Sequence, residues 1–400
     1  MYIDDIVNDL NCNINLFADD TSLYVIVDDP VTSTRALQSD IDKISNWALT
    51  WLVKFNPLKS ESLVLSKKCN KPSHPTLKMF ESDILSVNSH KHLGLILSSN
   101  CTWGQHLDDI KEKAWSRVNL LRSLKHTLDR KSLEIMYFSF IRPILEYSDV
   151  VWDNCNNVQK LSLERIQYES ARIVTGCSRL VSIARLMLEA GWETLEERRR
   201  KHKLVLFYKM TKGLVPEYLA SMVPQQVGQT CTYNLRNSNN INTIPSRTSL
   251  YASSFLPATV HLWNSLPNET RNCNSINSFK YFLNKDKPKC NKLFYYGKRR
   301  LQIIHTRLRT SCSSLNEHLY LKNIVNSPMC RCGAIENAKH FFFSCLFYSH
   351  IRPELIYNIQ TITTPSTDVI LNGDPNTTFE NNLKLFDAVH KYIESSGRFD

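Results

Sequence analysis

The sequence predicts an α+β fold, with short β-hairpins in about the first hundred residues and mostly helices after them. Two apolar runs flank a pair of acidic residues between Asn13 and Val25, which is the pattern of two strands joined by a turn. Apolar residues then recur at helical spacing from Leu37 to Trp51, and over long stretches from Gln105 onward. A set of three cysteines and one histidine near the C-terminus predicts a small metal-stabilised module.

The 400 residues suggest two to three domains, and the sequence pattern divides the chain into four parts. We expect hairpins in residues 1–100 and a helical region in residues 101–222. Residues 223–300 are rich in Asn, Ser and Thr and predict an irregular connector. Residues 301–400 are expected to hold a basic segment followed by the cysteine–histidine module.

The net charge of +11 is unevenly distributed. Residues 1–42 contain nine aspartates against one arginine, whereas residues 285–309 contain nine lysines and arginines against one aspartate. An acidic metal-binding end and a basic remainder suit an enzyme that acts on a polyanion, although either run alone is also typical of a solvated face. There is no membrane-length apolar run and no signal-peptide pattern. We therefore expect no membrane association and an intracellular location, cytoplasmic or nuclear.

Asp19 and Asp20 stand at the turn between the first two predicted strands. Adjacent carboxylates repel each other unless a cation, water or a basic group neutralises them. Mg²⁺ and Mn²⁺ prefer oxygen ligands, and polymerases use two such ions to clamp the attacking and leaving oxygens. The pair therefore predicts a divalent-cation site. The alternative is a simple acidic turn, because aspartate is common in turns.

The stretch Leu16-Phe17-Ala18-Asp19-Asp20-Thr21 resembles the aspartate hairpin of reverse transcriptases from non-LTR retrotransposons (LINE-like, jockey-type). Residues 1–6 resemble the end of the preceding element in that family, and residues 137–152 resemble a segment of its helical, thumb-like region. The resemblance implies a partial polymerase palm followed by a thumb-like region. It also implies Asp19 and Asp20 as catalytic ligands of Mg²⁺ or Mn²⁺. The implied partners are an RNA template, a DNA primer and deoxynucleoside triphosphates.

Two further motifs carry the resemblance. Asn56-Pro57-Leu58-Lys59-Ser60 is similar to the family's "Asn-x-x-Lys-(Ser/Thr)" element, which implies that Lys59 neutralises the pyrophosphate leaving group. A surface lysine in a turn is the alternative. His92-Leu93-Gly94 is similar to the family's "Tyr-Leu-Gly" hairpin, which supports the primer terminus. This implies nucleic-acid contacts at His92 and Gly94, with His92 departing from the usual tyrosine.

The spacing Cys330-x-Cys332-x7-His340-x4-Cys345 predicts a closed, structural zinc site, because three thiolates and an imidazole form a tetrahedral ligand set. The Cys-x-Cys spacing is tighter than usual, so buried free cysteines are the alternative. A similar knuckle occurs near the C-terminus of the resembled family. Together with the basic residues Lys298, Arg299 and Arg300 just upstream, it predicts a grip on nucleic acid.

The family's first catalytic aspartate and its "Pro-Gln-Gly" element have no counterpart in the sequence. We therefore expect a fragment of an RNA-directed DNA polymerase that is inactive alone, with an apolar sheet face left exposed. The alternative function is a non-catalytic nucleic-acid-binding protein derived from a retroelement.

Overall fold

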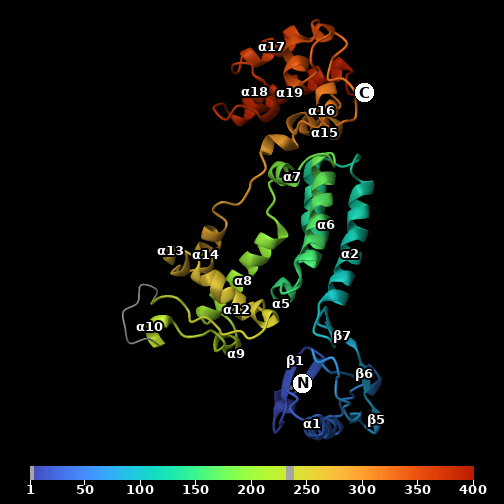
Figure 1. Ribbon diagram of the computed structural model, residues 1–400, viewed down its shortest axis with the longest axis vertical. Helices are drawn as coiled ribbons and strands as arrows, with labels where there is room; N and C mark the ends of the chain where they lie inside the picture. The colour runs from blue at the N-terminus through green and yellow to red at the C-terminus, as the bar shows by residue number, and fades with distance from the viewer. Residues whose placement is uncertain (1–3, 231–237) are drawn as a thin grey trace. The chain divides into compact units, whose positions relative to one another are not determined.

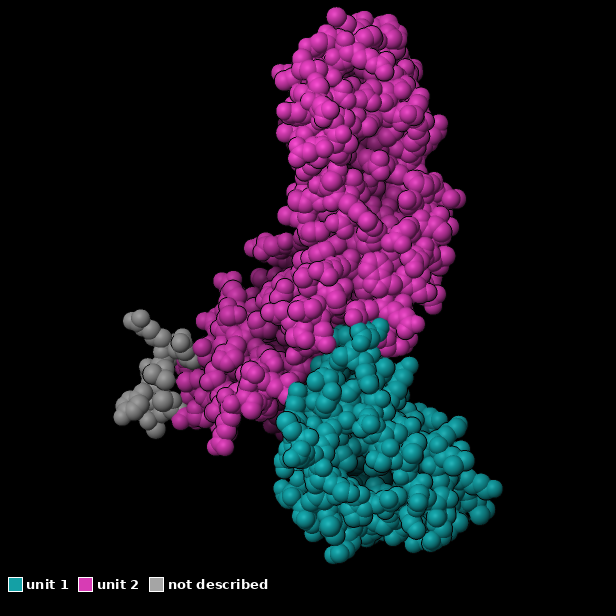
Figure 2. All heavy atoms as spheres, turned by 45° about the vertical axis from the view of Figure 1, so that its right-hand side comes forward, with its two compact units in different colours: residues 1–108 teal, residues 109–400 magenta. Residues whose placement is uncertain are grey.

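The computed structural model describes residues 4–230 and 238–400, and the chain divides into two compact units, residues 1–108 and 109–400 (Figures 1 and 2). Small sheets occur in unit 1 and helices dominate unit 2, which confirms the predicted α+β class. The first half of the motif at residues 1–6 lies outside the described residues, as do residues 231–237 of the expected connector. Along the described chain, no helix is both long and apolar enough to cross a membrane.

The strands of unit 1 pair in twos. The pairs β1–β2, β4–β5 and β7–β8 are antiparallel, and β3–β6 is parallel. One long helix, α1, lies against β4. The elements are β1 (Asn13–Phe17), β2 (Asp20–Tyr24), α1 (Pro30–Thr50), β3 (Glu61–Leu63), β4 (Lys78–Met79), β5 (Ser82–Asp83), β6 (Leu85–Val87), β7 (Ser89–His92) and β8 (Leu95–Ser98), with 3-10 turns at Asp4–Val7 and Pro57–Lys59.

Helix α1 begins where a carboxylate caps it. The Asp29 side chain accepts the backbone N–H of Thr32 at 2.7 Å, and Pro30 follows at the first helical position. Ile41 and Ile44 are buried, and Ile41 forms a small core with Met79 and Ile84.

Unit 1 leaves many large apolar side chains in water. Ile26, Leu52 and Leu58 are 81%, 90% and 91% exposed, and Phe17 on the first hairpin is 63% exposed. Phe17 belongs to an isolated two-stranded sheet, which cannot bury both of its faces, whereas Ile26, Leu52 and Leu58 lie outside the strands in connecting segments.

Unit 2 contains a long helical region followed by the cysteine–histidine module. Helix α2 starts in the last residues of unit 1 and continues into unit 2. The helices are α2 (Gly104–Ser123), α3 (Arg130–Met136), α4 (Arg142–Glu146), α5 (Asp149–Trp152), α6 (Asn157–Thr175), α7 (Ile183–Ala190), α8 (Leu195–Thr211), α9 (Glu217–Ala220), α10 (Val227–Thr230), α11 (Ser249–Ala252), α12 (Phe255–Asn264), α13 (Asn268–Arg271), α14 (Ile276–Leu283), α15 (Arg299–Arg309), α16 (Asn316–Tyr320), α17 (Arg352–Gln360), α18 (Thr367–Asn372) and α19 (Phe379–Ser396). One π-helical turn, Tyr137–Ile141, separates α3 from α4 just before Pro143, and another lies at His340–Ser344. Short 3-10 turns lie at Lys292–Tyr295 and Leu346–Tyr348.

Residues 223–300 are more ordered than the sequence predicted. Helices α12 and α14 pack against α8 and form an aromatic core with it. Trp263 meets Phe207 edge-on at 5.4 Å between ring centroids, and Phe279 stacks on Tyr208 at 4.5 Å. These helices are only eight to ten residues long. Their stability comes from these tertiary contacts, which a local pattern does not reveal.

Basic residues of α8 form ion pairs inside unit 2. Arg198 pairs with Glu146, and Arg199 and Lys203 both bind Asp153, at 2.8 and 2.5 Å. These carboxylates lie in the α4–α5 region, so these ion pairs dock α8 onto α4 and α5. The ion pairs are part of the interior of unit 2.

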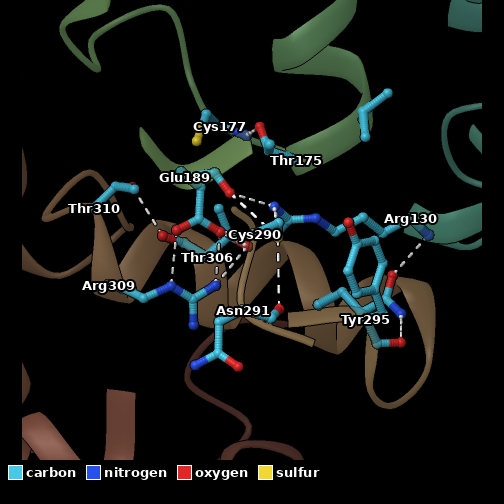
Figure 3. A network of polar contacts seen from close by, with 12 residues as sticks. Arg130, Thr175, Cys177, Glu189, Cys290, Asn291, Tyr295, Thr306, Arg309 and Thr310 are labelled. Carbon is cyan, nitrogen blue, oxygen red and sulfur yellow. Dashed lines mark hydrogen bonds and ion pairs between the residues drawn. The ribbon is translucent and has the colours of Figure 1, made fainter. Parts of the chain in front are cut away.

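A buried carboxylate joins three helices of unit 2 (Figure 3). Glu189 at the end of α7 accepts Arg130 Nη1 of α3 at 2.7 Å, and Arg309 of α15 binds both of its oxygens at 2.8 and 2.9 Å. All three side chains are under 10% exposed. Burial alone would raise the pKa of Glu189, but Arg309 and Arg130 hold it below its usual value, so the group is an anion. The Arg309 guanidinium also lies over the Phe294 ring, 3.5 Å from its centroid.

Replacing Glu189 tests this network against an exposed ion pair. Glu189→Gln leaves two buried guanidiniums without their anion, so we expect it to cost about 3–5 kcal/mol of unfolding free energy. Glu354→Gln removes the partner of Lys391 in a pair whose side chains are 57% and 64% exposed, and is expected to cost less than about 1 kcal/mol. Urea unfolding followed by helical circular dichroism measures both. Equal midpoints for the two variants would contradict the role given to Glu189.

Candidate functional site

The first hairpin presents its two carboxylates at a strained turn. Phe17 pairs with Asp20 across β1 and β2, so the turn consists of Ala18 and Asp19 alone. Ala18 has a φ of +52°, in the left-handed region that two-residue hairpin turns require at their first position. An L-residue other than glycine is disfavoured there by about 1–2 kcal/mol. The backbone strain therefore lies immediately beside the acidic pair.

Strand alternation assigns the acidic pair to the solvent side. Asp20 shares a face with Phe17 and Tyr24, which are both exposed, whereas Leu16 and Leu23 lie on the other, half-buried face. Asp19 and Asp20 are exposed, and among the described residues neither is ion-paired. The described residues also place no third acidic, histidine or cysteine ligand beside them, since the metal-ligand cluster found there lies elsewhere. A cation at this hairpin could therefore bind the two carboxylates, with water as its remaining ligands.

Asp40 positions this hairpin, and the sequence analysis missed it. Its buried carboxylate accepts the backbone N–H groups of Asn11 and Cys12, at 2.8 and 2.7 Å, just before β1 begins. It also binds Lys43 Nζ at 3.1 Å. Burial opposes ionisation, but these donors keep the pKa of Asp40 below its ordinary value. The carboxylate therefore ties β1 to α1, through residues 28 positions or more apart in the chain.

The other predicted residues of unit 1 lie on separate turns. Lys59 is exposed in the 3-10 turn at Pro57–Lys59, which Asn56 caps by accepting the N–H of Leu58 at 3.0 Å. His92 and Gly94 belong to the predicted β7–β8 hairpin, whose turn is Leu93-Gly94. Both turn residues have positive φ, the signature of a type I′ turn. Among the described residues Lys59 makes no ion pair with Asp19 or Asp20, so the structure does not join these groups directly.

The three predicted basic residues at the start of α15 differ in their surroundings. Lys298 is 82% exposed and lies 3.6 Å from Glu394, and Arg300 is 60% exposed and pairs with Asp400. Arg299 is buried and donates to the carbonyl oxygens of Ile173 and Val174, at 2.6 and 2.8 Å. Only Lys298 and Arg300 therefore face solvent, while Arg299 fastens α15 to the end of α6.

The predicted zinc ligands converge. The ligand atoms of Cys330, Cys332, His340 and Cys345 all lie within 4.8 Å of one another. The Sγ atoms of Cys330 and Cys345 are 3.7 Å apart, and Cys332 Sγ is 3.2 Å from His340 Nε2. Zinc–sulfur bonds of about 2.3 Å in a tetrahedron place two sulfurs roughly 3.8 Å apart. Three soft thiolates and one imidazole thus fit zinc, in a closed shell that indicates a structural role.

Local backbone geometry brings these ligands together. The Cys330 N–H donates to the Ala334 oxygen at 2.7 Å, which folds residues 330–334 into a tight loop. Gly333 has a φ of +88°, which only glycine adopts freely. His340 opens a π-helical turn, and its N–H donates to Asn337 Oδ1 at 2.8 Å.

The side chains around the cluster adjust its chemistry. Burial lowers the pKa of His340, which favours the neutral imidazole that binds metal. The backbone N–H of Ala334 lowers the pKa of Cys332, whereas burial raises the pKa of Cys345 to about 11. A bound cation would supply the charge that the buried Cys345 thiolate needs. This is the balance expected of a metal site rather than of inert thiols.

Two arginines that the sequence analysis did not single out hold this module together. Arg398 binds both oxygens of Glu336 at 2.7 and 2.8 Å, and Glu336 also accepts the N–H of Asn316. Arg352 donates to the carbonyls of Phe342 and Cys345. Their partners lie 7 to 62 residues away, so no short motif identifies them.

Comparison with known proteins shows which proteins the chain is similar to. The chain is 25% identical over 190 residues to the probable RNA-directed DNA polymerase from transposon BS of Drosophila melanogaster, covering 46% of this chain and 21% of that protein. It is 24% identical over 189 residues to the corresponding protein of the X-element, with the same coverage. It is 22% identical over 163 residues to the RNA-directed DNA polymerase of the mobile element jockey from Drosophila funebris, covering 40% and 18%.

The curated relatives of this chain are RNA-directed DNA polymerases of non-LTR retrotransposons. The resemblance found in the sequence is confirmed at that level. The similarity spans less than half of the chain and about a fifth of each relative. No protein-family model and no solved structure matches the chain.

Metal analysis tests the cysteine–histidine site. We expect purified chain to hold one zinc ion, and Cys330→Ser to lose it because a closed shell needs all four ligands. Cys312→Ser changes a cysteine outside the cluster and is expected to retain the metal. Elemental analysis measures all three proteins. Equal zinc content in Cys330→Ser and Cys312→Ser would show that Cys330 is not a zinc ligand.

Asp40→Asn tests the support of the acidic hairpin. We expect it to weaken protection of the amides of residues 11–24 by about 1.5–3 kcal/mol, the range for hydrogen bonds to a charged group. Asp42→Asn changes an exposed neighbour on the same helix and serves as control.

The pH dependence of this effect follows from the pKa of Asp40. Because that pKa is lowered in the folded chain, its contribution is complete above the ordinary value of 3.8 and is lost as pH falls through the folded value. Hydrogen exchange at neutral pH and below pH 3.8, corrected for intrinsic rates, measures it. Identical exchange in the two variants at neutral pH would refute the role of Asp40.

Proposed function

We propose that the chain is part of a reverse transcriptase of a non-LTR retrotransposon, an RNA-directed DNA polymerase. Residues 1–100 would be part of its palm and residues 101–222 its thumb-like region. The observation that carries the proposal is the solvent-facing pair Asp19 and Asp20 at a strained two-residue turn, in a chain whose relatives are such polymerases.

The proposed roles of the residues rest on their exposure and on the resemblance to the polymerase family. Asp19 and Asp20 would hold Mg²⁺ or Mn²⁺, and bound divalent ions stabilise the charge on the attacking and leaving oxygens of nucleotidyl transfer. Exposed Lys59 would neutralise the pyrophosphate of a deoxynucleoside triphosphate. The β7–β8 turn at His92 and Gly94 would support a DNA primer paired with an RNA template. Asp40 fixes the hairpin but touches no substrate, so it is a positioning residue.

The acidic hairpin supplies only part of a two-metal site. Two ions held in register need carboxylates from more than one element, and the described residues gather no third ligand at Asp19 and Asp20. We therefore propose that this chain alone does not extend a primer, and that its hairpin works together with further carboxylates.

A second candidate function rests on the cysteine–histidine cluster. A closed zinc shell on a basic chain, without a complete catalytic site among the described residues, suits a non-catalytic nucleic-acid-binding protein derived from a retroelement. Cation binding at the hairpin separates the two candidates, because only the first requires Asp19 and Asp20 to hold a divalent ion.

Metal binding tests the hairpin without requiring catalysis. Titration with Mn²⁺, followed by electron paramagnetic resonance, is expected to show weak binding that Asp19→Asn reduces. Asp9→Asn removes a single exposed carboxylate of the same unit and, since asparagine tolerates the positive φ found there, is expected to leave binding unchanged. Equal Mn²⁺ binding by the two variants would remove the hairpin as a cation site.

Primer extension on a poly(rA) template with an oligo(dT) primer tests the activity. The isolated chain is expected to incorporate no deoxynucleotide, because its acidic site is incomplete. Incorporation that depends on Asp19 would overturn the proposed inactivity and establish the polymerase. Incorporation that survives Asp19→Asn would contradict the role of the hairpin.

A further inference from the structure

A pocket of about 320 Å³ lies in unit 2 where the end of α6 meets α15 and the end of α2. Six cationic side chains line it, against a single carboxylate, Glu169. The cations come from three separate places in the sequence: Arg122 and Lys125, Arg172 and Arg179, and Arg299 and Arg307. The sequence analysis singled out only Arg299 among them.

Glu169 cannot neutralise this set. Its two oxygens are shared by three guanidiniums, those of Arg122 at 3.1 Å, Arg179 at 3.7 Å and Arg172 at 3.9 Å. Within residues 4–230 and 238–400, Lys125 and Arg307 have no carboxylate partner. Like charges held together repel, so the pocket has a standing excess of positive charge that an anion would relieve.

The C-terminal end of a helix normally repels anions, but two arginines reverse this effect at the end of α6. The last carbonyls of α6 carry partial negative charge. Arg299 covers those of Ile173 and Val174, and Arg307 Nε donates to the oxygen of Gly176 at 3.1 Å. Burial and the nearby Arg130 and Arg307 lower the pKa of Arg299 to about 10, so it stays protonated at neutral pH. The floor of the pocket is therefore positive.

The rim of the pocket is open to a long ligand. Arg179 is 82% exposed and Arg307 is also exposed, while Nη1 and Nη2 of Arg307 carry no bond to the described residues. Guanidinium groups bind phosphate oxygens in pairs. Charges spread along an accessible rim suit successive phosphates of a chain better than one enclosed anion.

We propose that this pocket binds the phosphodiester backbone of single-stranded RNA, through Lys125, Arg179 and Arg307. The choice of RNA as the polyanion rests on the proposed function, whereas the preference for phosphate rests on the charges alone. The pocket lining holds no Phe, Tyr or Trp and one imidazole, that of His126, whereas six of its side chains are cationic, so phosphate contacts that are independent of base sequence would dominate.

Binding of a short fluorescein-labelled RNA to the full chain, followed by anisotropy without magnesium or nucleotides, tests the proposal. The double variant Lys125→Gln/Arg179→Gln removes two positive charges at the rim of the pocket, and neither side chain makes a hydrogen bond to the backbone of the described residues. Lys322→Gln/Lys384→Gln removes two exposed charges elsewhere in the same unit and is the matched control. We expect the pocket variant to lose about tenfold in affinity, and the slope of log K against log salt to fall by about 1.4, as two single-strand phosphate contacts are lost. In the control variant, both the affinity for RNA and the salt slope are expected to change by much less.

Two results would overturn the proposal. One is equal affinity and salt slope for the two double variants. The other is an affinity that does not rise between a dinucleotide and a longer RNA, which would assign the pocket to a single free anion. Both double variants leave Asp19 and Asp20 intact, and the assay contains neither magnesium nor nucleotides. The RNA assay therefore reports on the pocket even where primer extension refutes the proposed polymerase function.

Discussion

The buried carboxylate of Glu189 is the constraint on which unit 2 depends. Two guanidiniums from helices almost 180 residues apart in sequence share it, and none of the three groups can return to water without unfolding the contact. Arg309 also reaches the Leu371 carbonyl at 2.8 Å, which connects the network to α18. Helix α15 is therefore the element through which the cysteine–histidine module and the helical region form one body.

Much of the basic character of this chain serves its interior. Basic residues of α8 form ion pairs with Glu146, Asp153 and Glu193, and Arg299 binds the last carbonyl groups of α6. A positive net charge thus says little about where a polyanion binds. What matters is the charge left without an internal partner, and in unit 2 part of that charge lies at the pocket beside Gly176.

The sequence predicted those features whose causes are local. The hairpin around Asp19 and the convergence of Cys330 with Cys345 each follow from residues close together in the chain. The roles of Asp40, Glu189 and Arg299 could not be found in that way, because these side chains have partners 28 to 174 residues distant. Their importance comes from burial, and burial is a property of the assembled fold. The same reason explains why α12 and α14 were expected to be irregular.

We expect metal binding by Cys330, Cys332, His340 and Cys345 to stabilise the body that α15 joins to the helical region. Phe341 and Phe342 lie next to His340 and share one core with α15 and α19, so ordering of the ligands should extend through that core. Hydrogen exchange of the full chain, with zinc bound and with zinc removed, tests this directly. We expect zinc to slow exchange in residues 330–345 and also in α15 and α19, while β1 and β2 remain unchanged. A zinc effect confined to residues 330–345 would contradict the claim.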